Sequence, residues 1–324
     1  MSISSLYIMP TLECNCRCEY CYIPEPEKKP AADTDHFLKV MEKFIQEADK
    51  PDPPYVPQLR FIGGEPYLCQ QKLFSLTARF LEAFPGHLAV INSNATLVSP
   101  EAAAYWKSLP GRIVHIVSLD GLKDLHDKRR ILSDGGSSFD LVIRGIRLLQ
   151  DQGLPVFCNM VLDRESGSRT GQFFEFVKKD LGMNDISLSL RSESGYWKSA
   201  DEQFLLLGQA YSHAEYYGLR VTGHHRLYLG HCIPELKCRA GCNTLVITPE
   251  ARFSACQRFV GKSAEAAFNP DMNLAEHRAG LETADFCYHG ESRALGEKLF
   301  GLYNEKYRQY LEVTELDRVF FGVI

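Results

Sequence analysis

The feature that most constrains the fold is a repeated alternation of short, β-rich runs with longer runs of helical periodicity. A strand followed by a helix packs as a repeated unit, and successive units place their strands parallel in one sheet. Apolar residues at helical spacing follow most of the runs, as in residues 37–45 and 139–149. Six strand-helix units form an incomplete barrel. The predicted strands are residues 5–9, 58–62, 88–92, 113–119, 156–162 and 186–190.

Charge and cysteine content narrow the class of protein. The net charge of -5 and a pI near 6.1 argue against a nucleic-acid partner. No run approaches the roughly 18 apolar residues that cross a bilayer, and the N-terminus lacks an export signal, so we expect a cytoplasmic protein with no membrane partner. The chain has eleven cysteines, and structural disulfides do not explain them, because thiols stay reduced in a reducing compartment. Nine of them fall in two groups, which suggests metal ligands.

The first group follows the first predicted strand. Cys14, Cys18 and Cys21 can converge on one face of an iron-sulfur cube and leave its fourth iron without a protein ligand. An open iron can bind a cofactor or substrate. A structural zinc site is the alternative, although zinc takes four closed ligands and the local run has no histidine. Cys16, between the ligands, is expected to be a bystander.

Four motifs in order resemble those of the radical S-adenosylmethionine (radical SAM) family. All follow predicted strands, at the strand ends where barrel active sites gather. In the third motif, Ala95 stands where relatives carry glycine. The motifs are Cys14-x3-Cys18-x-Tyr20-Cys21, Gly63-Gly64-Glu65-Pro66, Ser93-Asn94-Ala95-Thr96, and Ser118-Leu119-Asp120-Gly121 continuing into His126-Asp127-x-x-Arg130.

The resemblance implies an α/β fold with a partial (β/α)6 TIM-like barrel over residues 1–225. It also implies a 4Fe-4S cluster held by three cysteines and S-adenosyl-L-methionine bound to the open iron. The glycine-rich motif would receive the cofactor's amino group, with Glu65 helping to neutralise it, and Arg191 either meets the cofactor carboxylate or is a solvated arginine. The implied cofactor-binding residues are Tyr20 beside the adenine, Gly63, Gly64, Glu65, Pro66, Asn94, Ser118, Asp120 and Arg191.

The second group resembles the C-terminal SPASM or Twitch modules of the same family. Residues 245–248 and 252–255 predict a β-hairpin between two cysteines, which with a helix over 292–311 makes a small module at 226–324. The dense cysteine run of a full SPASM domain is absent, and Ala251 replaces the expected hairpin glycine. One auxiliary iron-sulfur cluster, of the 4Fe-4S type, is therefore expected. Cys242 is either a substitute ligand of this cluster or a bystander. A zinc ion in the same four-cysteine site is the alternative. Its implied ligands are Cys232, Cys238, Cys256 and Cys287.

Relatives with these motifs commonly modify peptides or proteins by cross-linking, epimerisation or oxidation, so a peptide or protein substrate is the favoured hypothesis. A dehydrogenase of a small carbohydrate-like metabolite is the alternative, and a non-catalytic iron-sulfur or zinc-binding protein is one from another class. Because the chain starts almost at its first strand, a separate protein would bind a leader peptide. An electron donor such as flavodoxin or ferredoxin is implied.

The catalytic acid or base is not identified by the sequence. Relatives that oxidise a sulfatase side chain carry an aspartate where this chain has Gln257, which disfavours that activity. Candidate proton acceptors are Glu193, Asp120, His224, His225 and His231.

Overall fold

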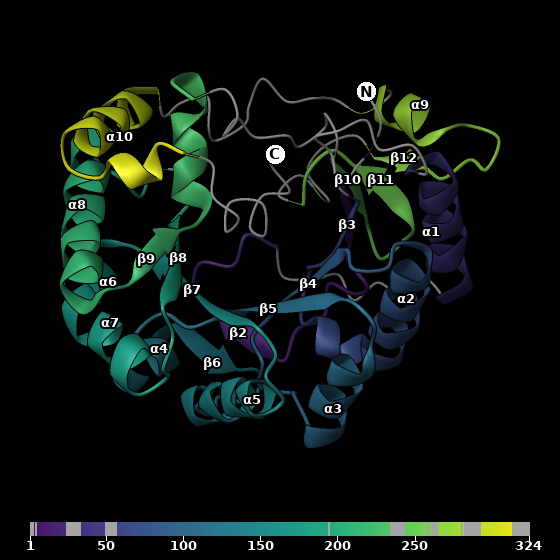
Figure 1. Ribbon diagram of the computed structural model, residues 1–324, viewed down its shortest axis with the longest axis horizontal. Coiled ribbons are helices and arrows are strands. Elements are labelled where there is room, and N and C mark those ends of the chain that lie inside the picture. Colours follow the sequence, from purple (N-terminus) through teal and green to yellow (C-terminus); the bar gives the residue numbers. More distant parts are fainter. Residues whose placement is uncertain are drawn as a thin grey trace.

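A ten-stranded sheet organises the part of the chain that the computed structural model describes (Figure 1). The strand order is β12-β11-β10-β1-β3-β4-β5-β7-β8-β9. In Figure 1 the strands line the inside of an arc and most helices follow its outside. The described residues are 3, 5–23, 34–48, 57–193, 195–233, 244–257, 260, 265–279, 281 and 293–312.

The six predicted strands are confirmed, and they lie side by side in chain order. Each pairs in parallel with the next, as connection through an intervening helix requires. The chain is therefore an α/β protein with a mostly parallel sheet. The six strands are β1 (Ser5–Ile8), β3 (Gln58–Phe61), β4 (Leu88–Ser93), β5 (Arg112–Ser118), β7 (Val156–Leu162) and β8 (Asp185–Leu190).

Four further strands extend the sheet at its two edges. β9 (Arg220–Thr222) pairs in parallel with β8, and β10 (Thr244–Ile247) pairs in parallel with β1. The predicted hairpin is confirmed, because β11 (Arg252–Ser254) runs antiparallel to β10, and β12 (Ala266–Ala267) then pairs with β11. Ala251, in the hairpin turn, has a φ of 58°.

The helices cover the outer face of the sheet, as their apolar spacing predicts (Figure 1). Residues 139–149, for example, lie in a helix whose Val142, Ile146 and Leu149 are buried. The predicted C-terminal helix is present, although it ends at Glu305. The helices are α1 (Thr34–Ala48), α2 (Gln70–Ala83), α3 (Pro100–Ser108), α4 (Lys123–Arg129), α5 (Phe139–Asp151), α6 (Arg164–Gly167), α7 (Thr170–Lys179), α8 (Ala200–Tyr217), α9 (Leu274–Ala279) and α10 (Arg293–Glu305), with 3₁₀ turns η1 (Pro66–Cys69), η2 (His224–His231) and η4 (Arg308–Tyr310).

The two faces of the sheet are packed differently. The main core lies between the strands and the outer helices. On the inner face, Val90 of β4 and Val114 and Ile116 of β5 form a separate buried layer with Leu227 of η2. Val114 also lines a cavity of about 590 Å³ near the amino-terminal ends of β5, β7, β8 and β9. A further buried cluster lies beside β1, β3 and β10 and consists of Tyr7, Met9, Ile62, Val246 and Val260. Ser93 and Ser118, in contrast, place hydroxyl groups at the carboxyl ends of β4 and β5.

A second, two-stranded sheet lies at that end. β2 (Cys16–Cys18) pairs antiparallel with β6 (Arg130–Leu132), and Cys18 lies opposite Arg130. This pairing joins the first cysteine group to the segment that follows the Ser-Leu-Asp-Gly motif. Among the described residues, no helix is both long and apolar enough to cross a membrane.

The contact between α5 and the turn after β4 leaves no room for a side chain at Gly145. A Cβ atom there would lie 2.2 Å from the carbonyl oxygen of Ala95. We expect Gly145→Ala to lower the free energy of unfolding by about 1–3 kcal/mol through overpacking. Gly208→Ala, in α8 with no atom within 4 Å of the new Cβ, should raise it by about 0.5–1 kcal/mol. Urea denaturation of the two variants measures the difference; equal stabilities would contradict the close approach.

Candidate functional site

The cysteine loop is held against the end of β3 by backbone hydrogen bonds. The amide of Gly64 donates to the carbonyl of Thr11 (2.9 Å), and the amide of Glu65 donates to that of Glu13 (2.8 Å). Gly63 has a φ of 117°, and a Cβ on Gly64 would lie 1.9 Å from the carbonyl oxygen of Glu13. The two glycines therefore let the cysteine loop approach the strand end.

The carboxylate of Glu65 ties this motif to the next strand. It is buried and accepts hydrogen bonds from the Ser93 hydroxyl (2.7 Å), the Asn94 amide (2.8 Å) and the Tyr67 amide (3.1 Å). Burial raises the pKa of Glu65 to about 7, although these donors oppose the rise. The sequence motifs after β3 and β4 are thus parts of one hydrogen-bonded unit.

A closed ring of hydrogen bonds joins that unit to the cysteine loop. Asn94 Nδ2 donates to Asn15 Oδ1 (2.8 Å), Asn15 Nδ2 donates to Thr96 Oγ1 (2.8 Å), and Thr96 Oγ1 donates to Asn94 Oδ1 (2.7 Å). Asn94 Nδ2 also lies 3.4 Å from Cys16 Sγ and 3.8 Å from Cys14 Sγ. Asn94 is expected to bind the cofactor, and its side-chain amide therefore faces the sulfur atoms of the cysteine loop.

Ala95 makes this ring possible by its backbone conformation. Its φ is 58°, in the left-handed region, at the position where the resemblance expects glycine. The turn brings Asn94 and Thr96 to the same side. Ala95 and Ala251, the two alanines at expected glycine positions, are both left-handed.

Arg130 connects the fourth motif with the cysteine loop. Its Nε donates to Asp120 Oδ2 (2.5 Å), its Nη1 lies 3.6 Å from Cys18 Sγ, and its guanidinium lies 5.4 Å from the Tyr20 ring centre. The other carboxylate oxygen of Asp120 accepts from the Val161 amide (2.8 Å). Both carboxylate oxygens of Asp120 are thus engaged within the protein.

His126 and Asp127 support the segment around Arg130. Burial lowers the pKa of His126 to about 4, so its neutral ring accepts at Nδ1 from the Asp120 amide (3.3 Å) and donates from Nε2 to the Ser138 hydroxyl (3.1 Å). The sequence predicts a helix N-cap at Ser138, and this is confirmed. Ser138 holds the N-cap position, but Asp127 Oδ1 accepts the amides of Ser138 (2.9 Å) and Phe139 (2.8 Å).

Arg191 lies in the wall of the site, next to Tyr20. Its side chain is 10% exposed, so it is not the solvated arginine of the alternative interpretation. It pairs with Glu19 (3.1 Å) and Glu193 (2.7 Å), and its guanidinium lies 5.8 Å from the ring centre of Tyr20 and 4.4 Å from that of Tyr196. Contacts with two aromatic rings and two carboxylates restrict the orientation of the guanidinium.

Of the other predicted site residues, some lie at the carboxyl ends of the strands and some are buried in the core. Ser118 ends β5 beside Asn159 of β7, whose amide oxygen accepts from Ser187 (2.8 Å) and Ser189 (3.1 Å). His224 contacts Ser189 (3.2 Å) at the same end. His225, in contrast, is buried and bonded to the Tyr211 hydroxyl (2.7 Å) and the Leu188 carbonyl (3.0 Å), a structural setting. Pro66, another predicted residue, is buried at the start of η1.

The sequence predicts no role for four residues of the site, namely Asn15, Thr96, Arg130 and Asn159. Three of them lie in motifs that the sequence does mark, because Asn15 stands between two predicted ligands and Thr96 and Arg130 end two of the motifs. Asn159 had no signal beyond a polar residue inside an apolar strand.

The donor set fits an iron-sulfur cluster. Cys14, Cys18 and Cys21 are free thiols on one loop. Hydrogen bonding with Cys16 lowers the pKa of Cys14 to about 6, whereas burial raises that of Cys18 to about 11 against the attraction of Arg130. In the described ranges, no three His, Cys, Asp or Glu side chains gather as one metal ion requires. A cube instead spreads its cysteine ligands over separate irons.

The second cysteine group is only partly described. Cys256 follows β11 and is buried, and Cys232 follows η2, where its amide donates to the Leu229 carbonyl (2.8 Å). Cys238, Cys242 and Cys287 lie outside the described residues.

Comparison with known proteins places the fold and site in context. Residues 8–177 match the Radical SAM superfamily. A serine-type anaerobic sulfatase-maturating enzyme of Klebsiella aerogenes is 25% identical over 293 residues, covering 82% of this chain and 66% of the enzyme. Two further curated relatives are matched over 48% and 41% of their lengths, so the chain spans about half of them.

Solved structures share the fold. The structure of anSMEcpe with bound AdoMet has a TM-score of 0.73 at 14% identity, covering 95% of this chain and 98% of that one. Streptococcus suis SuiB bound to precursor peptide SuiA has a TM-score of 0.66 at 17% identity, covering 90% of this chain and 67% of that one.

Gly64→Ala tests whether the strand end positions the cysteine loop. The new Cβ would collide with the Glu13 carbonyl, so we expect the loop to shift and the iron bound after anaerobic reconstitution to fall. Gly171→Ala is the control, because its nearest neighbour would lie 3.4 Å away. Iron analysis and thermal denaturation of both variants check this. Full iron loading of Gly64→Ala would refute the positioning role.

Proposed function

Because the chain belongs to the radical SAM superfamily, we propose that it binds a 4Fe-4S cluster through Cys14, Cys18 and Cys21 and cleaves S-adenosylmethionine reductively. Cluster and cofactor together supply a 5'-deoxyadenosyl radical that removes a hydrogen atom from the substrate. We further propose that the six central strands are the family's partial (β/α)6 barrel. The observation that carries the proposal is the convergence of the other three motifs on the cysteine loop through Glu65, Asn94 and Arg130.

The chain's own residues would do three things in this reaction. Asn94 and Arg130 place hydrogen-bond donors against the loop sulfurs, which favours their thiolate form. The guanidinium groups of Arg130 and Arg191 both contact the Tyr20 ring, which would help to set the position of an adenine beside it. The remaining cofactor contacts are proposed to come from the motif residues Gly63, Gly64, Glu65, Pro66, Ser118 and Asp120.

We propose a peptide or protein as the substrate. Support comes from the relatives: one is named as a sulfatase-maturating enzyme, and SuiB was solved with a precursor peptide. Gln257, where sulfatase-modifying relatives carry aspartate, favours a peptide reaction other than sulfatase oxidation. His224 and Glu193 lie near the strand ends and are the candidate proton acceptors.

We also propose that residues 226–324 form an auxiliary-cluster module. The β10-β11 hairpin followed directly by the buried Cys256 supports this, since it resembles the frame in which a cysteine closes the second strand. Cys232, Cys238 and Cys287 would complete the ligand set. A cytoplasmic location and a separate leader-binding protein remain parts of the proposal.

Cofactor cleavage tests the central proposal. Anaerobically reconstituted protein, reduced with dithionite, should convert S-adenosylmethionine to 5'-deoxyadenosine, and Cys14→Ala, Cys18→Ala or Cys21→Ala should abolish the product and lower the bound iron by one cluster. Cys16→Ala is the matched control, expected to keep both. Cys256→Ala should lose the auxiliary iron. Fully loaded protein that yields no 5'-deoxyadenosine would be the non-catalytic iron-sulfur protein of the alternative hypothesis.

Isotope transfer tests the substrate class. A candidate precursor peptide, encoded beside this chain and deuterated at its side chains and Cα atoms, should pass deuterium into 5'-deoxyadenosine, which mass spectrometry detects. A peptide of the same composition in scrambled order is the control. Deuterium transfer from a labelled carbohydrate but from none of the peptides would favour the dehydrogenase alternative.

A further inference from the structure

The orientation of the Asn94 side-chain amide is dictated by its neighbours. Its Oδ1 accepts from the backbone N–H of Thr96 (3.0 Å) and from the Thr96 hydroxyl (2.7 Å). A backbone N–H can only donate, so the atom that faces it must be the amide oxygen. The nitrogen Nδ2 is therefore the atom that faces the cysteine loop.

The two hydrogens on this nitrogen have different acceptors. Asn94 is buried, so both hydrogens need acceptors inside the protein. Asn15 Oδ1, at 2.8 Å, takes one. Among the described residues, the acceptors left for the other are Cys16 Sγ (3.4 Å) and Cys14 Sγ (3.8 Å). Cys14 binds iron as a thiolate, and a thiolate accepts a hydrogen bond better than the neutral thiol of Cys16.

Asn15 and Thr96 lock the amide in this orientation. Asn15 Nδ2 donates to Thr96 Oγ1 (2.8 Å), so each member of the ring donates once and accepts once, in one direction. Turning over either asparagine amide would bring two donors or two acceptors face to face. Asn15 is itself held, because its carbonyl accepts from the Ser133 amide (2.9 Å).

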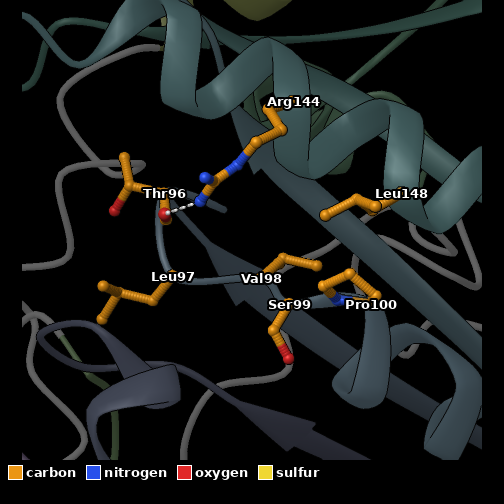
Figure 2. Close-up of a pocket in the computed structure, with 7 residues that line it drawn as sticks. All are labelled: Thr96, Leu97, Val98, Ser99, Pro100, Arg144 and Leu148. Carbon is orange, nitrogen blue, oxygen red and sulfur yellow. Dashed lines mark hydrogen bonds between the residues drawn. The ribbon is translucent and has the colours of Figure 1, made fainter.

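The turn after β4 is held from its other side by α5, as Figure 2 shows. The guanidinium of Arg144 donates to the Thr96 carbonyl (3.5 Å), and Gly145 lets α5 approach the Ala95 carbonyl. Leu97, the next residue of the turn, lines a cavity of about 380 Å³ and is not a member of the ring. A change at Leu97 therefore alters the turn and leaves the ring intact.

We propose that Asn94 raises the reduction potential of the cluster by donating a hydrogen bond to Cys14. Asn15 and Thr96 are the positioning residues for its amide. This inference rests on the proposed function, which makes Cys14 an iron ligand. Reduction adds one electron and no proton, and N–H donors to the ligand sulfurs stabilise the added negative charge. Without the Asn94 N–H, the backbone amide of Cys16 (3.4 Å) remains as a donor to Cys14.

The midpoint potential of the reconstituted protein tests this role. It is measured by EPR during stepwise reduction with dithionite, in the absence of S-adenosylmethionine. Asn94→Ala should lower the equilibrium constant for one-electron reduction about threefold to tenfold, which lowers the potential by about 28–59 mV. Thr96→Val and Asn15→Ala should lower the constant about twofold, because the backbone amide of residue 96 still holds Asn94 Oδ1. Thr96→Ser keeps the hydroxyl and should restore the wild-type potential.

Leu97→Ala is the matched control. It changes the same turn without touching the ring, and its potential should equal that of the wild type. The shift caused by Asn94→Ala should persist in a Cys16→Ala background, because Cys14 is the sulfur that accepts. Disappearance of the shift in that background, or an unchanged potential in Asn94→Ala, would overturn the proposal. So would a loss of bound iron in the ring variants with no change in potential, which would show a purely structural role.

Two further outcomes separate this proposal from the proposed function. If Asn94→Ala binds no iron, the potentials of Thr96→Val and Asn15→Ala decide the role of the amide by their direction. If the variants shift as expected but the wild type forms no 5'-deoxyadenosine, reductive cleavage is wrong and the role of Asn94 stands. A wild type with no reducible cluster would overturn both.

Discussion

The candidate site depends on how a short loop with little regular structure is fixed at the ends of three strands. Backbone amides of Gly64 and Glu65 hold the segment before Cys14, the Asn94 side chain holds Asn15, and the pairing of β2 with β6 places Cys18 opposite Arg130. Because these contacts come from different strand-helix units, the loop takes its shape only when the sheet is complete. The hydrogen-bonded Glu65 carboxylate joins two of the units and is itself buried.

Much of the fold was predictable because its units are local. Each central strand is a run of β-rich residues, and the apolar spacing that predicted α1 and α5 is confirmed by their buried faces. Parallel order follows from helical connections. The hairpin at 244–254 was visible from two apolar runs around Pro249. The motif resemblance also marked Ala95 and Ala251, which the structure finds in the left-handed region.

The contacts that assemble the site were harder to predict from the sequence, because they join residues that are far apart along the chain. Nothing local tells that Asp127, eleven residues before Ser138, supplies the cap of α5, or that Asn15 closes a ring with Thr96. The need for the two glycines of the second motif, Gly63 and Gly64, also comes from a contact with a distant part of the chain. Their absence of side chains, attributed to the cofactor, is required already by the carbonyl of Thr11 at Gly63 and by that of Glu13 at Gly64. Likewise, β9 and β10 are short edge strands whose pairing is set by the completed sheet.

The layer of Val90, Val114, Ile116 and Leu227 lies next to the cavity at the amino-terminal ends of the strands. The walls of this cavity include Tyr310 and Phe157, and Val114 belongs both to its lining and to the layer. A molecule held there would be insulated from the cysteine loop by packed aliphatic carbon. Val114 therefore couples the cavity and the layer: a smaller side chain at this position would enlarge the cavity and loosen the aliphatic layer at the same time.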